Sequence, residues 1–314
     1  MKFTTTLLAS SAIIGAGTLA FADAHADMAK EMTLVSWGGA YQASQDKAYL
    51  QPYLEMHPEI SAVWDESSNE AVAKLRAMNE AGNVTWDLVD VVAADAIRLC
   101  DEGLAMEIDA EEMLAEAPDG TSAEDDFGDL LVSDCFIPQI VYSTTFGYRT
   151  DMVGDTPPTK ICDVFDTEAY PGKRALEKRP INNMEWALLC DGVAKDEVYD
   201  VLATPEGQEK ALAKLDTIKD NVIWWSAGAD TPQLLADGEV VMGSTYNGRL
   251  FSVIEEQDQP VAMLWDAQVF DLDGWIIPAG LPDDRLARVK DFVKFATDTQ
   301  RLSDQSQYIS YGPA

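Results

Sequence analysis

The segment TLVSWGGAYQASQDKAYLQPYL, residues 33–54, joins a short apolar run to a helical pattern through the corner Trp37-Gly38-Gly39. Two glycines leave the backbone open to close approach, and the indole beside them offers a flat apolar face. We therefore predict that this strand-to-helix corner contacts a small molecule. The alternative is core packing of Trp37, because tryptophan side chains are often largely buried.

Outward from this corner, segments with strand and helix character alternate. Strands are predicted at 31–37, 61–67 and 86–95, and helices at 41–58, 68–82 and 96–104. The segment 86–95 is almost continuously apolar, as in strands that a parallel sheet buries on both faces. This alternation predicts an α/β lobe with a largely parallel sheet, in which ligands bind beyond the carboxyl ends of the strands.

The second half of the chain follows an acidic stretch, 107–134, which we interpret as surface helix and loop. Extended segments are predicted at 136–151, 222–227, 239–246 and 259–280, and helices at 182–194, 204–221, 231–239 and 283–308. With 314 residues, the chain is long enough for one large domain or two lobes.

The first residues have the pattern of a secretory signal peptide. Lys2 precedes an apolar stretch, 7–21, and Ala20-Phe21-Ala22 is a small-x-small cleavage site. This predicts a signal peptide at 1–22, although a second such site at 24–26 leaves the position of the cut open. A membrane anchor is the weaker interpretation, because the apolar run is too short to span a bilayer comfortably. We expect export to the periplasm.

Four cysteines, an even number, lie far apart without a CxxC pair. In an oxidising compartment they predict two disulfides, and we expect nearest-neighbour pairing, Cys100 with Cys135 and Cys162 with Cys190. A zinc site is the alternative, but it is poorly supported without CxxC spacing or nearby histidines.

The composition argues against several classes of function. A formal net charge of −33 repels nucleic acid and anionic lipid. The chain contains two histidines, His25 and His57, which nearly removes histidine-dependent nucleophilic catalysis and histidine metal clusters. No nucleotide-binding glycine motif is present, so we expect no cofactor and no metal. We expect a binding protein, and an exported hydrolase that uses carboxylates stays open as the alternative.

Several charged residues stand at predicted strand ends or helix starts. Arg249 follows Tyr246 after a strand and could bind a carboxylate bidentately or pair with a surface acid. Asp271, Asp273 and Trp275 share one face of a strand, and Asp273 would suit an ammonium group unless the strand faces solvent. Glu185 lies in the first turn of a helix, where a carboxylate can bind ligand or simply favour the helix dipole.

Taken together, the order and spacing of several segments resemble the periplasmic putrescine/spermidine-binding proteins, the solute-binding subunits of ABC importers. The segments are LVSWGGAY, SSNEAVAKLRAM, TWDLVDV, FIPQIVYSTTFGYRTD, YPGKRAL, ADGEVVMGSTYNGR and DLDGWIIPAG. The resemblance implies a two-lobed, type II-like periplasmic-binding-protein fold with a mostly parallel sheet in each hinge-linked lobe. Lobe 1 would comprise 28–140 and 270–314, and lobe 2 would comprise 141–269. It also implies a monomer that delivers its solute to ABC permease subunits.

The resemblance also assigns residues to the ligand cleft. Trp37 matches a tryptophan that stacks on the ligand, and Tyr246 and Tyr311 match further aromatics. Glu185 and Asp273 match carboxylates that meet amino groups. The backbone around Gly38, and Ala93 and Ala94 at a strand end, would complete the site. Relatives usually continue past the YGP motif with a helical segment, so we expect further chain beyond Ala314.

Two departures from the family pattern change the expected ligand. Gly39 stands where an aspartate is typical, and Arg249 stands where another acid is expected. A cleft that loses one acid and gains a guanidinium disfavours a diamine, because a second ammonium would lie near a cation at low dielectric. Our hypothesis is a solute with one ammonium and one carboxylate, such as an ω-amino acid or an opine-like compound, with polyamines as the other possibility.

Overall fold

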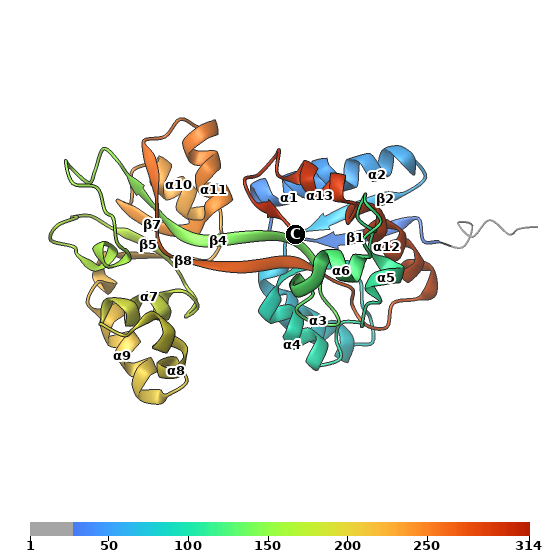
Figure 1. Cartoon of the computed structure of the whole chain (residues 1–314), viewed down its shortest axis with the longest axis horizontal. Helices are drawn as coiled ribbons and strands as arrows, with labels where there is room; N and C mark the ends of the chain where they lie inside the picture. Colours follow the sequence, from blue (N-terminus) through green and yellow to red (C-terminus); the bar gives the residue numbers. More distant parts are fainter. Residues whose placement is uncertain (1–27) are drawn as a thin grey trace, which may run out of the picture.

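The computed structural model describes residues 28–314 and has two lobes linked by two long strands (Figure 1). These strands, β4 (Ile137–Arg149) and β8 (Val261–Ile276), pair with each other antiparallel along their length. They join the strands of both lobes into one sheet of order β2-β1-β3-β8-β4-β7-β5-β6, and β9 (Gly312–Pro313) also pairs with β4. The C-terminal residues thereby return to the junction between the lobes (Figure 1).

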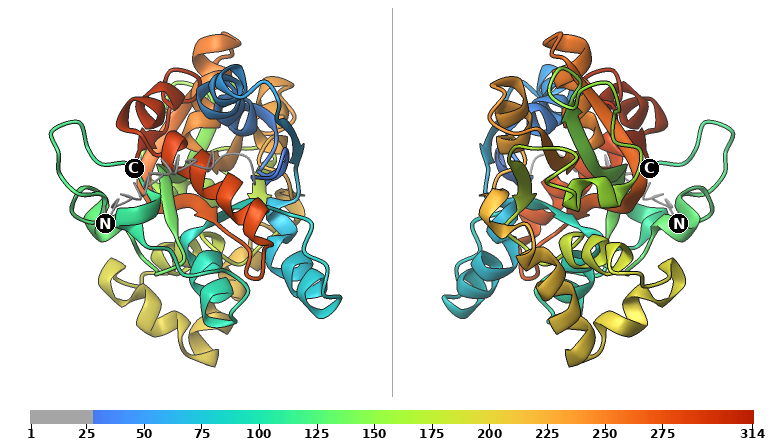
Figure 2. Two further views of the ribbon diagram at one scale, coloured as in Figure 1. Left: turned by 90° about the vertical axis from the view of Figure 1, so that its right-hand side faces the viewer. Right: turned by 90° about the vertical axis from the view of Figure 1, so that its left-hand side faces the viewer.

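Lobe 1 is built on parallel strands, as the sequence predicts. β1 (Glu31–Val35) lies between β2 (Ser61–Asp65) and β3 (Leu88–Val92) and is parallel to both. Every residue of β3 is buried, which confirms the fully buried strand predicted within 86–95. Helical segments cover both faces of this sheet in the end-on views of Figure 2. They are α1 (Gly39–Gln45), a π-helical turn (Asp46–Leu50), α2 (Gln51–Met56), the 3-10 turn Ser68–Glu70, α3 (Ala71–Glu80), α4 (Ala93–Asp101), α5 (Ala110–Met113), α6 (Ala123–Phe127), the 3-10 turn Gly128–Leu130, α12 (Asp283–Ala296) and α13 (Thr299–Gln305).

Lobe 2 has its own parallel strands and its own core. β5 (Arg174–Glu177) is parallel to β6 (Val222–Trp225) and to β7 (Met242–Tyr246), and β7 is antiparallel to β4. Apolar side chains around Trp186 form a core separate from those of lobe 1. The helical segments are Ile161–Phe165 (3-10), α7 (Asn183–Cys190), Lys195–Glu197 (3-10), α8 (Val198–Leu202), α9 (Pro205–Asp216), Lys219–Asn221 (3-10), α10 (Asp230–Ala236), α11 (Asn247–Phe251) and the π-helical turn Ser252–Glu256.

The predicted α/β class and the two-lobed arrangement agree with this architecture. The chain enters lobe 2 through β4 and returns through β8, so the lobes are joined where Ile140 pairs with Asp273 and Thr144 with Val269. The boundaries that we predicted at 140/141 and 269/270 stay a prediction. The predicted signal peptide, with its cleavage sites after Ala22 or Ala26, lies outside the described residues. Within 28–314, no helix has the length and apolar character needed to cross a membrane.

One predicted helix is wrong in its extent. The single closing helix expected at 283–308 is two helices, α12 and α13. The break falls at Asp298, whose side chain accepts a hydrogen bond from the backbone N–H of Gln300 at 3.0 Å and so caps the start of α13. Apolar periodicity continues across the break because both helices pack on lobe 1, with Phe292 and Leu302 in the same core.

Both disulfides have the connectivity expected from the sequence. Cys100 is bonded to Cys135 across 35 residues in lobe 1, and Cys162 is bonded to Cys190 across 28 residues in lobe 2. The second bond ties the 3-10 turn after β4 to the end of α7, the helix whose first turn carries Glu185.

Replacing Cys162 and Cys190 together by serine is expected to lower the free energy of unfolding by about 3–4 kcal/mol, because loops of this length gain that much chain entropy when opened. Denaturant unfolding of the oxidised protein and of the variant measures the difference. The Cys100/Cys135 double serine variant is the matched control, with a similar loop and a similar expected loss. Unchanged denaturation midpoints in both variants would contradict the prediction.

Candidate functional site

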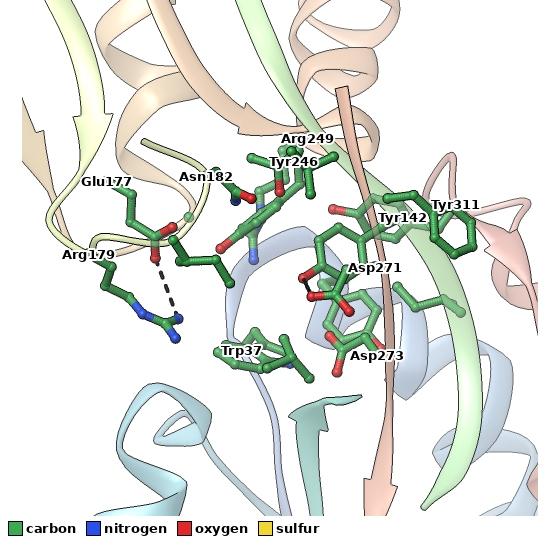
Figure 3. A pocket seen from close by; sticks show the side chains of 18 of the residues that line it. Trp37, Tyr142, Glu177, Arg179, Asn182, Tyr246, Arg249, Asp271, Asp273 and Tyr311 are labelled. Atoms are coloured by element: carbon green, nitrogen blue, oxygen red, sulfur yellow. Dashed lines mark hydrogen bonds and ion pairs between the residues drawn. The ribbon is translucent and has the colours of Figure 1, made fainter. Parts of the chain in front are cut away.

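A cavity of about 290 Å³ lies between the lobes, and both linking strands contribute to it (Figure 3). This volume is near the lower end of the range of small-molecule pockets, so the cavity suits a small solute. It is lined by Trp37, Tyr41, Asn69 and Val92 of lobe 1, by Ile140, Tyr142, Thr144, Val269, Phe270, Asp271 and Asp273 of the linking strands, by Glu177, Arg179, Ile181, Asn182, Glu185, Tyr199, Gly228, Tyr246 and Arg249 of lobe 2, and by Tyr311.

The corner after β1 brings Trp37 to this cavity, as the sequence predicts. The side chain is half-buried and lines the space between the lobes (Figure 3). Gly38 and Gly39 have φ angles of 66° and 58°, the left-handed region that glycine adopts without strain. They turn the chain from β1 into α1 but are not themselves among the lining residues. A Cβ on Gly39 would lie 3.0 Å from Nη1 of Arg249, so this glycine leaves space for a guanidinium from the opposite lobe.

Arg249 is the most unusual charged group of the cavity. It lies in α11 directly after β7, and only 6% of its surface is exposed. Among residues 28–314 it forms no ion pair, and its Nε is buried without a hydrogen-bond partner. The guanidinium lies 5.9 Å from the ring centre of Tyr246. Of the two alternatives for this residue, the structure does not show the surface ion pair, because no acid of residues 28–314 lies within 4.0 Å of the guanidinium.

Two other arginines show how differently Arg249 is placed. Arg174 is completely buried, and its guanidinium donates hydrogen bonds to three backbone carbonyls, those of Val164, Gly172 and Asp166. Arg179 lines the cavity but has a 44% exposed side chain and an ion pair with Glu177 at 3.7 Å. Because burying a charge without a partner is costly, Arg249 is the group in this cavity that a ligand anion would stabilise most.

The carboxylates of β8 lie on another side of the same cavity (Figure 3). Asp271 accepts a hydrogen bond from the hydroxyl of Tyr142 at 3.3 Å, and burial raises its pKa. Asp273 is 6% exposed, and burial together with the neighbouring Asp90 raises its pKa. Trp275, next on the same face, is buried in the core of lobe 1 against Tyr49 and does not reach the cavity.

Glu185 also lines the cavity from the first turn of α7. Its Oε2 is buried without a hydrogen-bond partner in the described part of the chain, and burial raises its pKa. A buried carboxylate oxygen without a partner, on a residue that lines a pocket, favours ligand contact over a purely local role at the helix terminus. The structure therefore places Glu185, Asp273 and Arg249 around one space.

Four tyrosines form one wall of the cavity. Tyr142 contacts Tyr246 and Tyr311 edge-on, with ring centres 5.4 and 6.3 Å apart, and Tyr41 contacts Tyr311 at 5.8 Å. The sequence pointed to Tyr246 and Tyr311 but missed Tyr41 and Tyr142. The position of Tyr142 in the middle of a long predicted strand was the available signal, because a strand that crosses between two lobes exposes its centre to the space between them.

Ala93 and Ala94 are not among the residues that line the cavity, contrary to expectation. β3 ends at Val92 and the chain turns at once into α4, so Val92 is the residue that reaches the cavity from this strand end. The helix begins three residues earlier than predicted, and its first residues are taken up by that turn. His57 is also absent from the lining.

The chain is similar to proteins of known family. Residues 48–314 match the model of a family described as bacterial extracellular solute-binding protein. The chain belongs to this family. The match covers most of both lobes, and it bears out the resemblance to solute-binding proteins of ABC importers.

For two relatives of this solute-binding protein, a ligand is known by name. The chain is 37% identical over 295 residues to the gamma-aminobutyric acid-binding protein of Pseudomonas aeruginosa, covering 94% of this chain and 80% of the relative. It is similar to the crystal structure of the protein MotA from A. tumefaciens B6 in complex with glucopine, with 31% identity and a TM-score of 0.80, covering 90% of this chain and 84% of MotA.

Two further structures agree with the fold of this solute-binding protein. The Atu4243 GABA receptor is 31% identical with a TM-score of 0.74, covering 90% of this chain and 82% of its own. The spermidine/putrescine-binding protein PotD of Streptococcus pneumoniae is 16% identical with a TM-score of 0.64, covering 89% and 81%, and at this identity it supports the fold alone.

Proposed function

We propose that this solute-binding protein binds a small zwitterion that carries one ammonium and one carboxylate, of the ω-amino acid or opine type. The observation that carries the proposal is Arg249, a buried guanidinium without an acidic partner among residues 28–314, in the same cavity as Asp271 and Asp273. A carboxylate of the ligand would supply the missing partner through charge-assisted hydrogen bonds. The ammonium would bind at the acidic side chains of β8.

The pocket itself supports an amphipathic, mostly extended solute. Trp37 and the tyrosine wall offer apolar faces to a carbon chain between the two charged ends. A diamine would place its second ammonium beside Arg249, and like charges in a water-poor site repel strongly. The gamma-aminobutyric acid and glucopine ligands named for the relatives agree with a solute that carries both charges.

The wider role proposed is transport. After export through a signal peptide at 1–22, the protein would act in the periplasm as a monomer. It would bind its solute between the lobes and deliver it to ABC permease subunits, with no catalytic step. Closure of the lobes about β4 and β8 would cover the ligand, because both strands run through the junction.

A matched ligand panel tests the proposal by titration calorimetry. Gamma-aminobutyric acid is compared with putrescine, which lacks the carboxylate, and with butyrate, which lacks the ammonium. We expect gamma-aminobutyric acid to bind at least about a hundredfold more tightly than either, because each analogue leaves one buried charged group unpaired. A thermal shift confirms binding, since a ligand at a hundred times its dissociation constant stabilises by about 2.7 kcal/mol. Equal affinity for putrescine would overturn the zwitterion proposal.

A further inference from the structure

A second carboxyl group, that of Asp90, lies next to Asp273 but outside the lining of the cavity. Asp90 is in the middle of β3 and is completely buried. In the β3–β8 register Asp90 is opposite Trp275, and Asp273 is opposite Val92. Asp90 and Asp273 are therefore diagonal neighbours on one face of the sheet, close enough for their side chains to interact. Asp273 lines the cavity, whereas Asp90 does not.

The groups around this pair are hydrogen-bond donors rather than cations. Gln45 donates its side-chain N–H to Oδ2 of Asp90 and accepts a hydrogen bond from Oγ of Ser36 at 2.6 Å. Oδ1 of Asp90 is buried without a partner in the described part of the chain, as are Nε1 of Trp37 and the hydroxyl of Tyr41. Hydrogen-bond donors around Asp90 and Asp273 can therefore stabilise a negative charge on these carboxyls, but no cationic side chain of residues 28–314 pairs with them.

The ionisable groups that face the pair come from five segments. Burial raises the pKa of each of them: Tyr41 of α1, Tyr49 of the π-helical turn that follows α1, Tyr142 of β4, Asp271 of β8 and Tyr311 of the C-terminal segment. Within residues 28–314, no lysine, arginine or histidine forms an ion pair with Asp90 or Asp273. Arg249 of lobe 2 lies near Tyr311.

Two adjacent carboxyls without a cation cannot both be ionised at little cost. Burial raises the pKa of Asp90 to about 6, and burial together with the charge of Asp90 raises the pKa of Asp273. Because the two carboxyls are adjacent on one face of the sheet, we expect them to titrate as a unit and to hold one proton between them in the ligand-free protein.

We propose that Asp90 is a positioning residue of the ammonium site, which shares a proton with Asp273, and that binding of the ligand ammonium expels this proton to solvent. The inference rests on the proposed function, because the ligand must carry an ammonium. The ammonium pairs with Asp273 from the cavity and takes over the role of the proton. Asp90 then remains ionised beside the donors Gln45, Trp37 and Tyr41. The ligand ammonium enters and one proton leaves, so the total charge of the ammonium site, with Asp90 and Asp273, does not change.

The consequence is a defined pH dependence of affinity. Because binding releases a proton, the dissociation constant falls as pH rises through the range in which the free pair is singly protonated. The slope approaches about tenfold per pH unit for the release of one full proton, and it flattens once the free pair has lost that proton.

Titration calorimetry with gamma-aminobutyric acid, from about pH 6 to about pH 8 in buffers of different ionisation enthalpy, measures the proton released. For the native protein we expect the release of up to one proton per ligand bound, and a dissociation constant that falls by up to about tenfold per pH unit. The Asp90→Asn variant is expected to bind with little proton release and a nearly flat profile. Asp90→Glu is expected to restore both. A native protein whose heat is independent of buffer, or an Asn variant with the native profile, would overturn the inference.

Two further measurements test the shared proton even if Asp90→Asn does not fold or the proposed ligand is wrong. The hydroxyl of Tyr41 has no hydrogen-bond partner among the described residues, but it lies near Asp90 and lowers the pKa of that carboxyl. Tyr41→Phe is therefore expected to move the pH profile upward, and this variant tests the pair if Asp90→Asn fails to fold. Carbon-13 NMR titration of the aspartate carboxyls in ligand-free protein tests the shared proton directly. If the carboxyls of Asp90 and Asp273 both titrate below about pH 5, the shared proton is overturned whatever ligand binds. If the ligand binds without proton release, this inference fails but the proposed function stays intact.

Discussion

Replacement of Arg249 by glutamine is expected to weaken binding of gamma-aminobutyric acid by at least about a hundredfold, with little change in the melting temperature of the free protein. The ligand carboxylate would lose its charged partner in a buried site, a loss of about 3–5 kcal/mol. The stability of the free protein should not change, because the native guanidinium is itself buried and forms no ion pair with residues 28–314. Titration calorimetry measures the first effect and thermal unfolding the second.

Arg179→Gln is the matched control for this experiment. Arg179 lines the same cavity, but it is 44% exposed and already paired with Glu177 at 3.7 Å. Exposed ion pairs contribute at most about 1 kcal/mol, so a change of less than about tenfold is expected. Arg249→Lys keeps the charge without the planar fork and should fall between the two. Equal losses for both glutamine variants would contradict the assignment of Arg249 as the carboxylate site.

Replacement of Gly39 by aspartate is expected to weaken binding of the zwitterion by about a hundredfold while it strengthens binding of putrescine. A Cβ at this position starts 3.0 Å from Nη1 of Arg249, so the new carboxylate would pair with the guanidinium and occupy the place of the ligand carboxylate. The cavity would also lose its free positive charge, which removes the repulsion of a second ammonium. Calorimetry with both ligands measures the exchange of preference.

Gly39→Asn is the control that separates charge from shape. Gly39 has a φ of 58°, a conformation that aspartate and asparagine both adopt more readily than other side chains, so the two variants carry a similar backbone cost. The amide cannot neutralise Arg249, so we expect zwitterion binding within about tenfold of the native value and no gain for putrescine. If both variants lose zwitterion binding equally, crowding of the corner and not charge explains the effect.

Much of the fold follows from local patterns. The alternation of strands and helices and the buried strand β3 depend on residues close together in the chain, and the structure agrees with both. The glycine corner was predictable for the same reason, because a left-handed turn is a property of the residues that form it. The two disulfides join cysteines 35 and 28 residues apart, and they too have the expected pairing. The break at Asp298 was missed because the apolar period continues through it on both helices.

The site was only partly predictable. Trp37, Glu185, Tyr246, Arg249, Asp273 and Tyr311 line the cavity as expected, but their roles as ligand contacts stay predictions. Tyr41 and Tyr142 are not part of a recognisable motif. In the sequence, Asp90 is a single polar residue inside an apolar strand. In a sequence with 55 acidic residues, nothing distinguished this carboxyl from the others.

By itself, the sequence determined the class of fold and the turn at Trp37-Gly38-Gly39, because periodicity and short-range sterics decide these features. Four cysteines predicted two disulfides but allowed three pairings, and the tertiary structure decided between them. Only the tertiary structure decided that Arg249 has no acidic partner in the described part of the chain and that Asp90 adjoins Asp273. Both results depend on segments far apart in the chain, the first on the approach of lobe 2 to Gly39 and the second on the antiparallel register of β3 and β8. Burial then gives these charges their strength, because water no longer screens them.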